Sequence, residues 1–374
     1  MKKKLCLILI LLFTILLVNN SNSADRGLIG PPQIELEENA QNAIVAWNGT
    51  EEVLILSTDI KSSERSLALG ILPLPSQPLE IKEGSFESFT NLQKIVNEKL
   101  KEHYLKRGYS LEDANRMGNE SGIQIVYRNI IGAHNITIVR VDNLTYFIDW
   151  AINFSVQHGL ENINFSESFK SSIENYLNMN IRYFVFDVIE TNETQQSINP
   201  IIYRFRTDFL YYPLNITAFS PAGETYSQVN VFAITKGLIK KSAISEYRHY
   251  IRHYINLTKE ELNDICPDIY QLFDTDPFLT GFNYYGILSY LQKDITIKEQ
   301  DLASPNLQLE FDNTVLVRVG ESKIVNVKVK NIGDEDLYVR LNIEDGIVGI
   351  KHKWFSIQPW SARIEKGNET IFEV

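Results

Sequence analysis

The feature that most constrains the fold is the grouping of short, β-branched apolar runs into blocks, with helical segments between the blocks. The runs expected to form strands are 43–47, 52–60, 67–78, 123–128, 135–141, 183–189, 201–206, 214–219 and 229–235. Apolar residues recur at helical spacing after Ser85 and over 145–158 and 167–179. Blocks of strands with inserted helices are typical of α+β folds. We therefore expect a mixed or mostly antiparallel sheet with packed helices, and a helical, tyrosine-rich region over 241–300.

Two local signals refine this expectation. The dipeptide Asn48–Gly49 predicts a tight hairpin turn with positive φ at both central residues. Pro73, Pro75 and Pro78 each remove a backbone donor, so the strand that carries them is expected at a sheet edge.

The composition changes at Ser304–Pro305, after which short strands alternate with turn residues. The expected strands are 307–311, 315–319, 324–330, 337–343 and 371–374. Their spacing predicts a small all-β immunoglobulin-like sandwich over 305–374. About 70 residues is short for that architecture, so we expect the sandwich to be incomplete, with a strand missing or supplied from elsewhere.

The start of the chain predicts a signal peptide over 1–23. Lys2–Lys4 precede the uncharged apolar run Leu5–Val18, and small serines follow at the spacing for cleavage before Ala24. The alternative is an uncleaved membrane anchor, although 14 residues is shorter than the roughly 20 that cross a bilayer. We expect the chain to be exported, to the cell surface or the extracellular space.

The mature chain is expected to contain three parts. Residues 24–40 hold glycines, prolines and glutamates and predict a solvated tether. Residues 41–300 form the α+β domain, and 305–374 form the sandwich.

Asn-x-Ser/Thr acceptors support export independently, since they occur more often than chance placement predicts. The ten predicted glycosylation sites are Asn48, Asn119, Asn135, Asn143, Asn153, Asn164, Asn192, Asn215, Asn256 and Asn368. The alternative is that an Asn-rich composition inflates the count. On the first interpretation the protein is a glycoprotein.

The cysteine content bears on the cellular compartment of the protein, and the net charge bears on the partners that it can bind. Cleavage would remove Cys6 and leave Cys266 alone, so no intrachain disulfide forms and stability must come from the apolar core. Cys266 has acidic neighbours and is expected to be buried and inert. A net charge of −11, before the loss of three lysines, makes nucleic acid an unfavourable partner. Export without disulfides favours a prokaryotic envelope, more specifically an archaeal one.

One group of residues has the spacing of a metal site. On a helix, His249 and His253 would lie at i and i+4, and Glu246 would offer a third ligand one turn earlier. The same helix would bury its Ile and Tyr residues and turn all three candidates toward solvent, which favours an ordinary polar face. The chain contains no nucleophile elbow, phosphate-binding loop or zinc-helix motif, and no cofactor is expected.

Several segments resemble a known family. They are Ala43–Gly49, Glu52–Asp59, Leu72–Ser76, Tyr203–Phe205 and Leu210–Thr217. Together they look like an uncharacterised family, a domain of unknown function, of exported bacterial and archaeal proteins, over about 41–240. The resemblance implies no known chemistry and no catalytic residues. Val319–Asp334 is similar to sandwich repeats of archaeal surface proteins.

These observations favour an exported, glycosylated cell-envelope protein with a non-catalytic binding or structural role. Its partner would be an envelope protein or polymer, and it would be membrane-associated only through an uncleaved N-terminal segment. The alternative is an envelope hydrolase or metal-dependent enzyme with an unrecognised site. A deep pocket with two ionisable groups within about 4 Å would favour the enzyme, and a flat, tyrosine-rich groove would favour the binding role.

Overall fold

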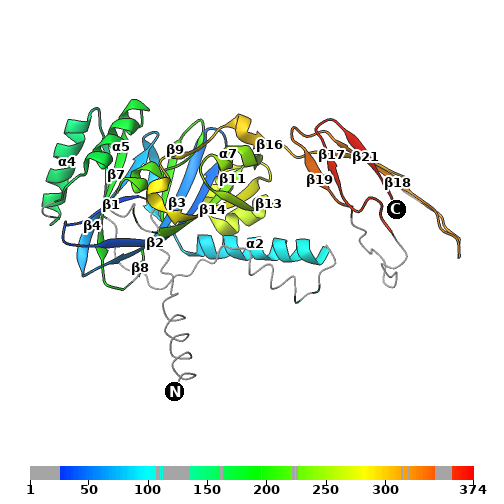
Figure 1. Cartoon of the computed structure of the whole chain (residues 1–374), viewed down its shortest axis with the longest axis horizontal. Coiled ribbons are helices and arrows are strands. Elements are labelled where there is room, and N and C mark those ends of the chain that lie inside the picture. Colours follow the sequence, from blue (N-terminus) through cyan, green and yellow to red (C-terminus); the bar gives the residue numbers. More distant parts are fainter. Residues whose placement is uncertain are drawn as a thin grey trace, which may run out of the picture.

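The structure is a computed structural model that describes residues 26–106, 110, 112, 135–160, 163–194, 196–220, 224, 226–312, 315–318, 320–341 and 356–374. The predicted signal peptide, Asn119 and the expected strand 123–128 lie outside the described residues. Helices and strands occur together, so the α+β prediction is confirmed (Figure 1). Among the described residues, no helix has the length and apolar character needed to cross a membrane.

The main sheet has eight strands in the order β13–β14–β11–β2–β3–β9–β5, with β8 beside β3. Their bounds are β2 (Leu36–Trp47), β3 (Glu51–Ser62), β5 (Pro78–Glu83), β8 (Gln196–Ser197), β9 (Ile201–Arg206), β11 (Tyr226–Thr235), β13 (Tyr250–Asn256) and β14 (Phe278–Ile287). Strands β2 and β11 run parallel, while the other described pairings of this sheet are antiparallel. The sheet is therefore mixed, as the sequence predicts.

A second, antiparallel sheet has the order β1–β4–β7–β6. Its elements and the helices that pack on it are β1 (Gly27–Ile29), β4 (Ser66–Leu74), β6 (Asn135–Arg140), β7 (Tyr183–Thr191), α4 (Leu144–Gln157) and α5 (Glu167–Asn178). Phe147 of α4 lies 5.0 Å from Phe184 and 5.5 Å from Phe186 of β7, ring centre to ring centre. These rings belong to the largest core cluster, which joins both sheets to α4 and α5.

Three helices cover the other face of the main sheet. They are α2 (Glu87–Lys106), α8 (Lys259–Ile265) and α9 (Pro267–Leu272). Phe89 and Leu92 of α2 are fully buried against Ile44 and Ile55 of the sheet in a separate core cluster. The apolar stripe predicted after Ser85 therefore faces the sheet, and Figure 1 shows α2 lying along it.

The N-terminal tether predicted over 24–40 is wrong for its described residues. Gly27–Ile29 form strand β1 on the edge of the second sheet, and Leu28 is fully buried. Arg26 forms a buried ion pair with Asp187, at 2.7 Å between Nη1 and Oδ2. Gly30, Pro31 and Pro32 mark only the turn between β1 and β2, while Gly27 lies in β1 itself, because tertiary pairing overrides its local preference.

Both local signals also need correction. The hairpin forms where it was predicted, between β2 and β3, but of Asn48 and Gly49 only Gly49 has positive φ, at +99°. Asn48 instead accepts hydrogen bonds at Oδ1 from the backbone N–H groups of Thr50 and Glu51. The single strand expected over 67–78 is two strands. Pro78 begins β5, which lies at the edge of the main sheet as predicted, whereas β4 lies inside its own sheet. Strand β1 pairs only with residues 69–71 of β4, so Pro73 lies beyond it and needs no donor on that side.

The largest error concerns the region expected to be helical. Residues 241–300 hold strands β13 and β14 as well as short helices. The remaining short elements of the domain are β10 (Leu210–Tyr212), α6 (Asn215–Ala218), β12 (Leu238–Ile239), α7 (Lys241–Ser245), η2 (Leu288–Tyr290), β15 (Ile295–Ile297), η3 (Glu299–Asp301) and β16 (Leu302–Ala303). The expected strand 214–219 is thus the helix α6. Strand β10 pairs with β15, and β12 with β16.

The C-terminal strands form two small antiparallel sheets around their own core. Their bounds are β17 (Leu307–Glu310), β18 (Asn326–Asn331), β19 (Leu337–Val339), β20 (Ala362–Ile364) and β21 (Glu369–Glu373). The sheets have the orders β17–β18–β21 and β19–β20, and Val329, Val339, Ile364 and Phe372 are buried between them. Residues 315–318, expected in a strand, have no regular structure, and β20 was not predicted.

Candidate ligand-binding pocket

A half-buried carboxylate, that of Asp294, organises the loops at the junction of α5, α6 and the 289–294 segment. Asp294 accepts hydrogen bonds from the hydroxyls of Tyr176 and Tyr211, each at 2.9 Å. It also accepts bonds from the backbone N–H groups of Leu214 (2.8 Å) and Asn215 (2.7 Å). Burial raises the pKa of both tyrosines well above their usual value, so the phenols stay protonated and donate.

Asn215 extends this network through its side chain. Its Oδ1 accepts a hydrogen bond from the Ser172 hydroxyl at 2.5 Å, and its Nδ2 donates to the Gln292 carbonyl at 2.6 Å. The Ile216 N–H donates to the Tyr176 hydroxyl. The Leu210–Thr217 segment, noted in the sequence only as a family mark, therefore fixes the position of the chain around Asp294.

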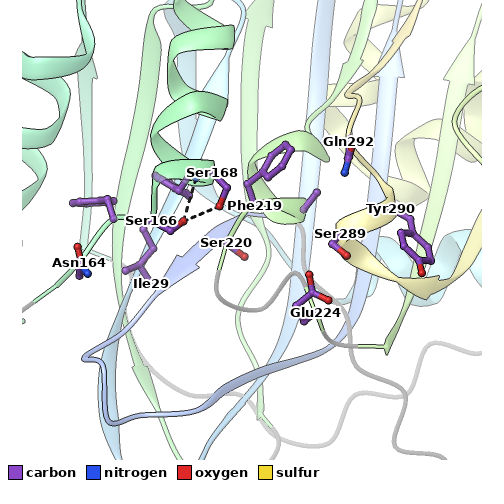
Figure 2. A pocket seen from close by; sticks show the side chains of 13 residues that line it. Ile29, Asn164, Ser166, Ser168, Phe219, Ser220, Glu224, Ser289, Tyr290 and Gln292 are labelled. Carbon is purple, nitrogen blue, oxygen red and sulfur yellow. Dashed lines mark hydrogen bonds between the residues drawn. The ribbon is translucent and has the colours of Figure 1, made fainter.

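The loops held in this way enclose a cavity of about 490 Å³. Its described lining residues are Ile29, Asn164, Phe165, Ser166, Ser168, Phe169, Ala218, Phe219, Ser220, Glu224, Ser289, Tyr290 and Gln292. Figure 2 shows Asn164 at one end, Ser166, Ser168 and Phe219 in the middle, and Tyr290 and Gln292 at the other end. Hydroxyl groups, amide groups and aromatic rings thus all line the pocket.

The start of α5 supplies one rigid wall. Ser166 caps the helix, because its Oγ accepts a hydrogen bond from the Phe169 N–H at 3.2 Å. The hydroxyls of Ser166 and Ser168 lie 3.0 Å apart and share a hydrogen bond (Figure 2). Glu224 is the one carboxylate among the described residues that line the cavity.

The metal candidates do not lie on a helix. Glu246 is exposed just after α7, which ends at Ser245, while His249 and His253 are buried. The prediction that the histidines face solvent is wrong, because this segment forms an extended strand and not a helix. Tyr250 and Tyr254 of β13 point outward instead, and an irregularity in the pairing between Ile251 and His253 reverses the faces of the strand.

The two histidines also lie on opposite faces of the main sheet. The His249 ring lies 5.6 Å from Phe282 and 5.7 Å from Tyr284, both in the larger core cluster. His253 packs on Gly281, on the face where Ile255 joins the cluster under α2. They cannot share one ion, and the described residues contain no group of three His, Cys, Asp or Glu side chains that could hold a metal.

Burial determines the protonation state of the two histidines and of Cys266. It lowers the pKa of both His249 and His253 from 6.5 to about 4, so both are neutral at pH 7. Cys266 is free and buried, and burial raises the pKa of its thiol. This position agrees with the expectation of an inert cysteine.

The predicted glycosylation sites among the described residues differ in their accessibility. Asn143, Asn153, Asn164, Asn256 and Asn368 are exposed, while Asn48 and Asn192 are half-buried. Asn135 begins β6, and nothing is described of its side chain. Asn215 is 9% exposed and both atoms of its amide are hydrogen-bonded, so the folded chain does not present it as an acceptor.

The fold and the pocket define an α+β protein whose cavity presents hydroxyls, amides and rings. The chain belongs to the family described as "Uncharacterized protein conserved in bacteria (DUF2330)", whose model matches residues 23–257. The match is wider at both ends than the resemblance noted in the sequence, and it contains Leu210–Thr217 but not Asp294. The description names bacteria, so an archaeal origin stays a prediction. No curated protein matches the chain.

Solved structures give only distant similarities. A crystal structure of baculovirus P35 aligns with a TM-score of 0.36 and 11% identity, covering 71% of this chain and 97% of that one. A mutated baculovirus P35 after caspase cleavage gives 0.32 and 8%, covering 90% and 87%. The caspase-8/P35 complex gives 0.30 and 6%, covering 90% and 84%. Similarity at this level carries no argument about the fold or function of this chain.

Proposed function

We propose that this protein is an exported, glycosylated cell-envelope protein that binds a saccharide of an envelope polymer without transforming it. The observation that carries the proposal is the lining of the 490 Å³ cavity, which combines aromatic rings with neutral polar groups. A volume of this size suits a ligand of one or two sugar rings.

The lining of the cavity matches the two kinds of surface that a sugar presents, its polar hydroxyl groups and its apolar C–H faces. The hydroxyls of Ser168, Ser220 and Ser289 can each donate and accept a hydrogen bond. The side-chain amides of Asn164 and Gln292 can donate through nitrogen and accept through oxygen. The rings of Phe219 and Tyr290 offer flat apolar surfaces to the C–H faces of a pyranose.

The same lining favours binding over the hydrolase alternative. Acid–base catalysis of glycoside cleavage uses two carboxyl groups about 5–9.5 Å apart. Glu224 has no second carboxylate and no histidine beside it among the described lining residues. A single carboxylate can orient a hydroxyl but lacks the partner that would activate water.

Export is supported by the position of the folded domain relative to the apolar N-terminal run. The family match begins at residue 23, next to the predicted cleavage site before Ala24. Arg26, close after this position, is buried and forms an ion pair with Asp187. Such an arrangement is expected when a signal peptide is joined directly to a domain that folds after its removal.

We also propose that residues 305–374 form an immunoglobulin-like module that presents the α+β domain at the cell surface. Two antiparallel sheets enclosing Val329 and Phe372 support this architecture. The cis peptide bond at Gln358–Pro359 lies between β19 and β20.

The binding proposal is tested with the mature chain, residues 24–374, on an array of neutral and acidic oligosaccharides, followed by calorimetry on the best ligand. Phe219→Ala and Tyr290→Ala should each weaken binding by about tenfold, because stacking on a ring contributes on the order of 1 kcal/mol or more. Tyr226→Ala is the matched control, since Tyr226 is exposed but does not line the cavity. An array without any ligand, or pocket variants that bind as the wild type does, would refute the proposal.

A further inference from the structure

A second cavity of about 210 Å³ adjoins the first, because Tyr290 and Gln292 line both. Its described lining residues are Glu246, Tyr247, Arg248, Tyr290, Leu291, Gln292 and Lys293. The two cavities therefore meet at Tyr290 and Gln292. Their chemistry differs: the first holds neutral polar groups and one carboxylate, whereas the second holds two cations.

Arg248 occupies a backbone conformation that a side chain other than glycine rarely adopts, with φ at +62°. Its neighbours hold it there. The Tyr247 hydroxyl donates to the Thr296 carbonyl at 3.0 Å, and the buried His249 ring hydrogen-bonds the Tyr247 carbonyl at 2.7 Å. Backbone strain that is maintained by anchored neighbours is characteristic of functional sites.

The strained turn places the Arg248 guanidinium against the ring that separates the two cavities. Its central carbon lies 5.7 Å from the centre of the Tyr290 ring, within the range of a cation–π contact. A sugar stacked on Tyr290 would therefore have this cation beside it.

Neither cation of the second cavity is neutralised by an ion pair with another described residue. Arg248 and Lys293 take part in none of the salt bridges of the described chain, although Glu246 lines the same cavity. The surroundings thus carry two positive charges and one negative charge, in a chain of net charge −11. Two unpaired cations in an acidic protein favour an anionic group at this point.

We infer that the two cavities form one groove for an acidic oligosaccharide, with the carboxylate of a uronic acid unit on Arg248 and Lys293. The neighbouring unit would lie in the larger cavity, against Phe219 and Tyr290. This inference rests on the proposed saccharide-binding function and adds the class of sugar that the site selects.

The test compares two probes with the same sugar backbone, tetragalacturonate with its charged carboxylates and its uncharged methyl ester, by calorimetry on the mature chain at low salt. The acid should bind about tenfold more tightly than the ester, because charge-assisted hydrogen bonds to Arg248 and Lys293 form only with the carboxylate. Arg248→Gln and Lys293→Gln should each reduce that preference several-fold, because each removes a positive charge that favours the carboxylate over the ester. Lys241→Gln is the control, because Lys241 is an exposed cation of α7 that lines neither cavity.

Arg248→Gly separates a binding role from a folding role. Glycine adopts positive φ without strain, so this variant should raise the midpoint of thermal unfolding while it lowers the preference for the acid. Loss of stability together with the preference would indicate that Arg248 only supports the fold, and would overturn the inference. Equal binding of acid and ester would overturn it too and leave the proposed function standing, whereas binding of no saccharide in either form would remove both.

Discussion

His249 and His253 are neutral side chains inside the domain, and this makes the stability of the protein depend on pH. Their pKa values are lowered from 6.5 to about 4 by burial. Between these two pH values the unfolded chain binds protons that the folded chain does not bind. The free energy of unfolding therefore falls as pH decreases from 6.5, by about 1.4 kcal/mol per pH unit for each histidine.

Urea unfolding at pH 7.5 and pH 5 measures this dependence. His249→Phe keeps a ring against Phe282 and Tyr284 but cannot be protonated, so it should lose less stability than the wild type on going to pH 5. His253→Gln should have the same effect independently, because the two residues lie on opposite faces of the sheet. If both variants lose as much stability as the wild type, the two histidines do not cause the dependence.

Glu52 has the opposite effect on how the stability of the protein depends on pH. It is fully buried, its Oε2 accepts a hydrogen bond from the Tyr211 N–H at 2.6 Å, and burial raises its pKa well above the usual value. The folded chain thus keeps a proton that the unfolded chain releases above pH 4.5, and stability falls as pH rises. Glu52→Gln preserves the shape and the acceptor without titrating. It should be more stable than the wild type by about 1 kcal/mol near pH 8, and the gain should disappear near pH 4.5.

At the scale of elements, the loops that form the pocket depend on Asp294. Asp294→Ala would leave two buried phenols and two backbone N–H groups without their acceptor, which should cost about 3 kcal/mol and lower the midpoint of thermal unfolding. Asp274→Ala, at an exposed turn, should stay within about 0.5 kcal/mol of the wild type. A small effect of Asp294→Ala would mean that the loops are held by apolar packing alone.

Helices α2, α4 and α5 could be predicted because their apolar stripes are long and follow a single period. Residues 244–255 could not, since their apolar positions fit a helical stripe as well as they fit a strand. Pairing with β14 decides the outcome, and a partner strand is not visible in a local pattern.

The candidate site was missed for a related reason. Its serines, rings and amides come from segments around residues 166, 219 and 290, and no spacing in the sequence joins them. The Leu210–Thr217 segment was the available signal. Its role became visible only with Asp294, which lies 79 residues after Asn215 in the chain.

At the scale of the whole molecule, export and glycosylation are measured together by mass spectrometry of the native protein. We expect Ala24 at the N-terminus and glycans on several exposed acceptors, with Asn164 and Asn256 among the candidates. We expect none on Asn215, because its amide is occupied within the fold. An intact Met1 with bare acceptors, or a glycan on Asn215 in the folded protein, would contradict this account.

The inclusion of β1 in the second sheet limits how the protein can be produced in the laboratory. A recombinant chain that starts after Ile29, chosen to omit an apparent linker, would lack the guanidinium that pairs with Asp187 and would uncover the hydrogen-bonding edge of β4. Such a product would be prone to aggregate during purification through pairing between the exposed β4 edges of different molecules. An affinity tag is better placed upstream of Arg26, or at the other terminus.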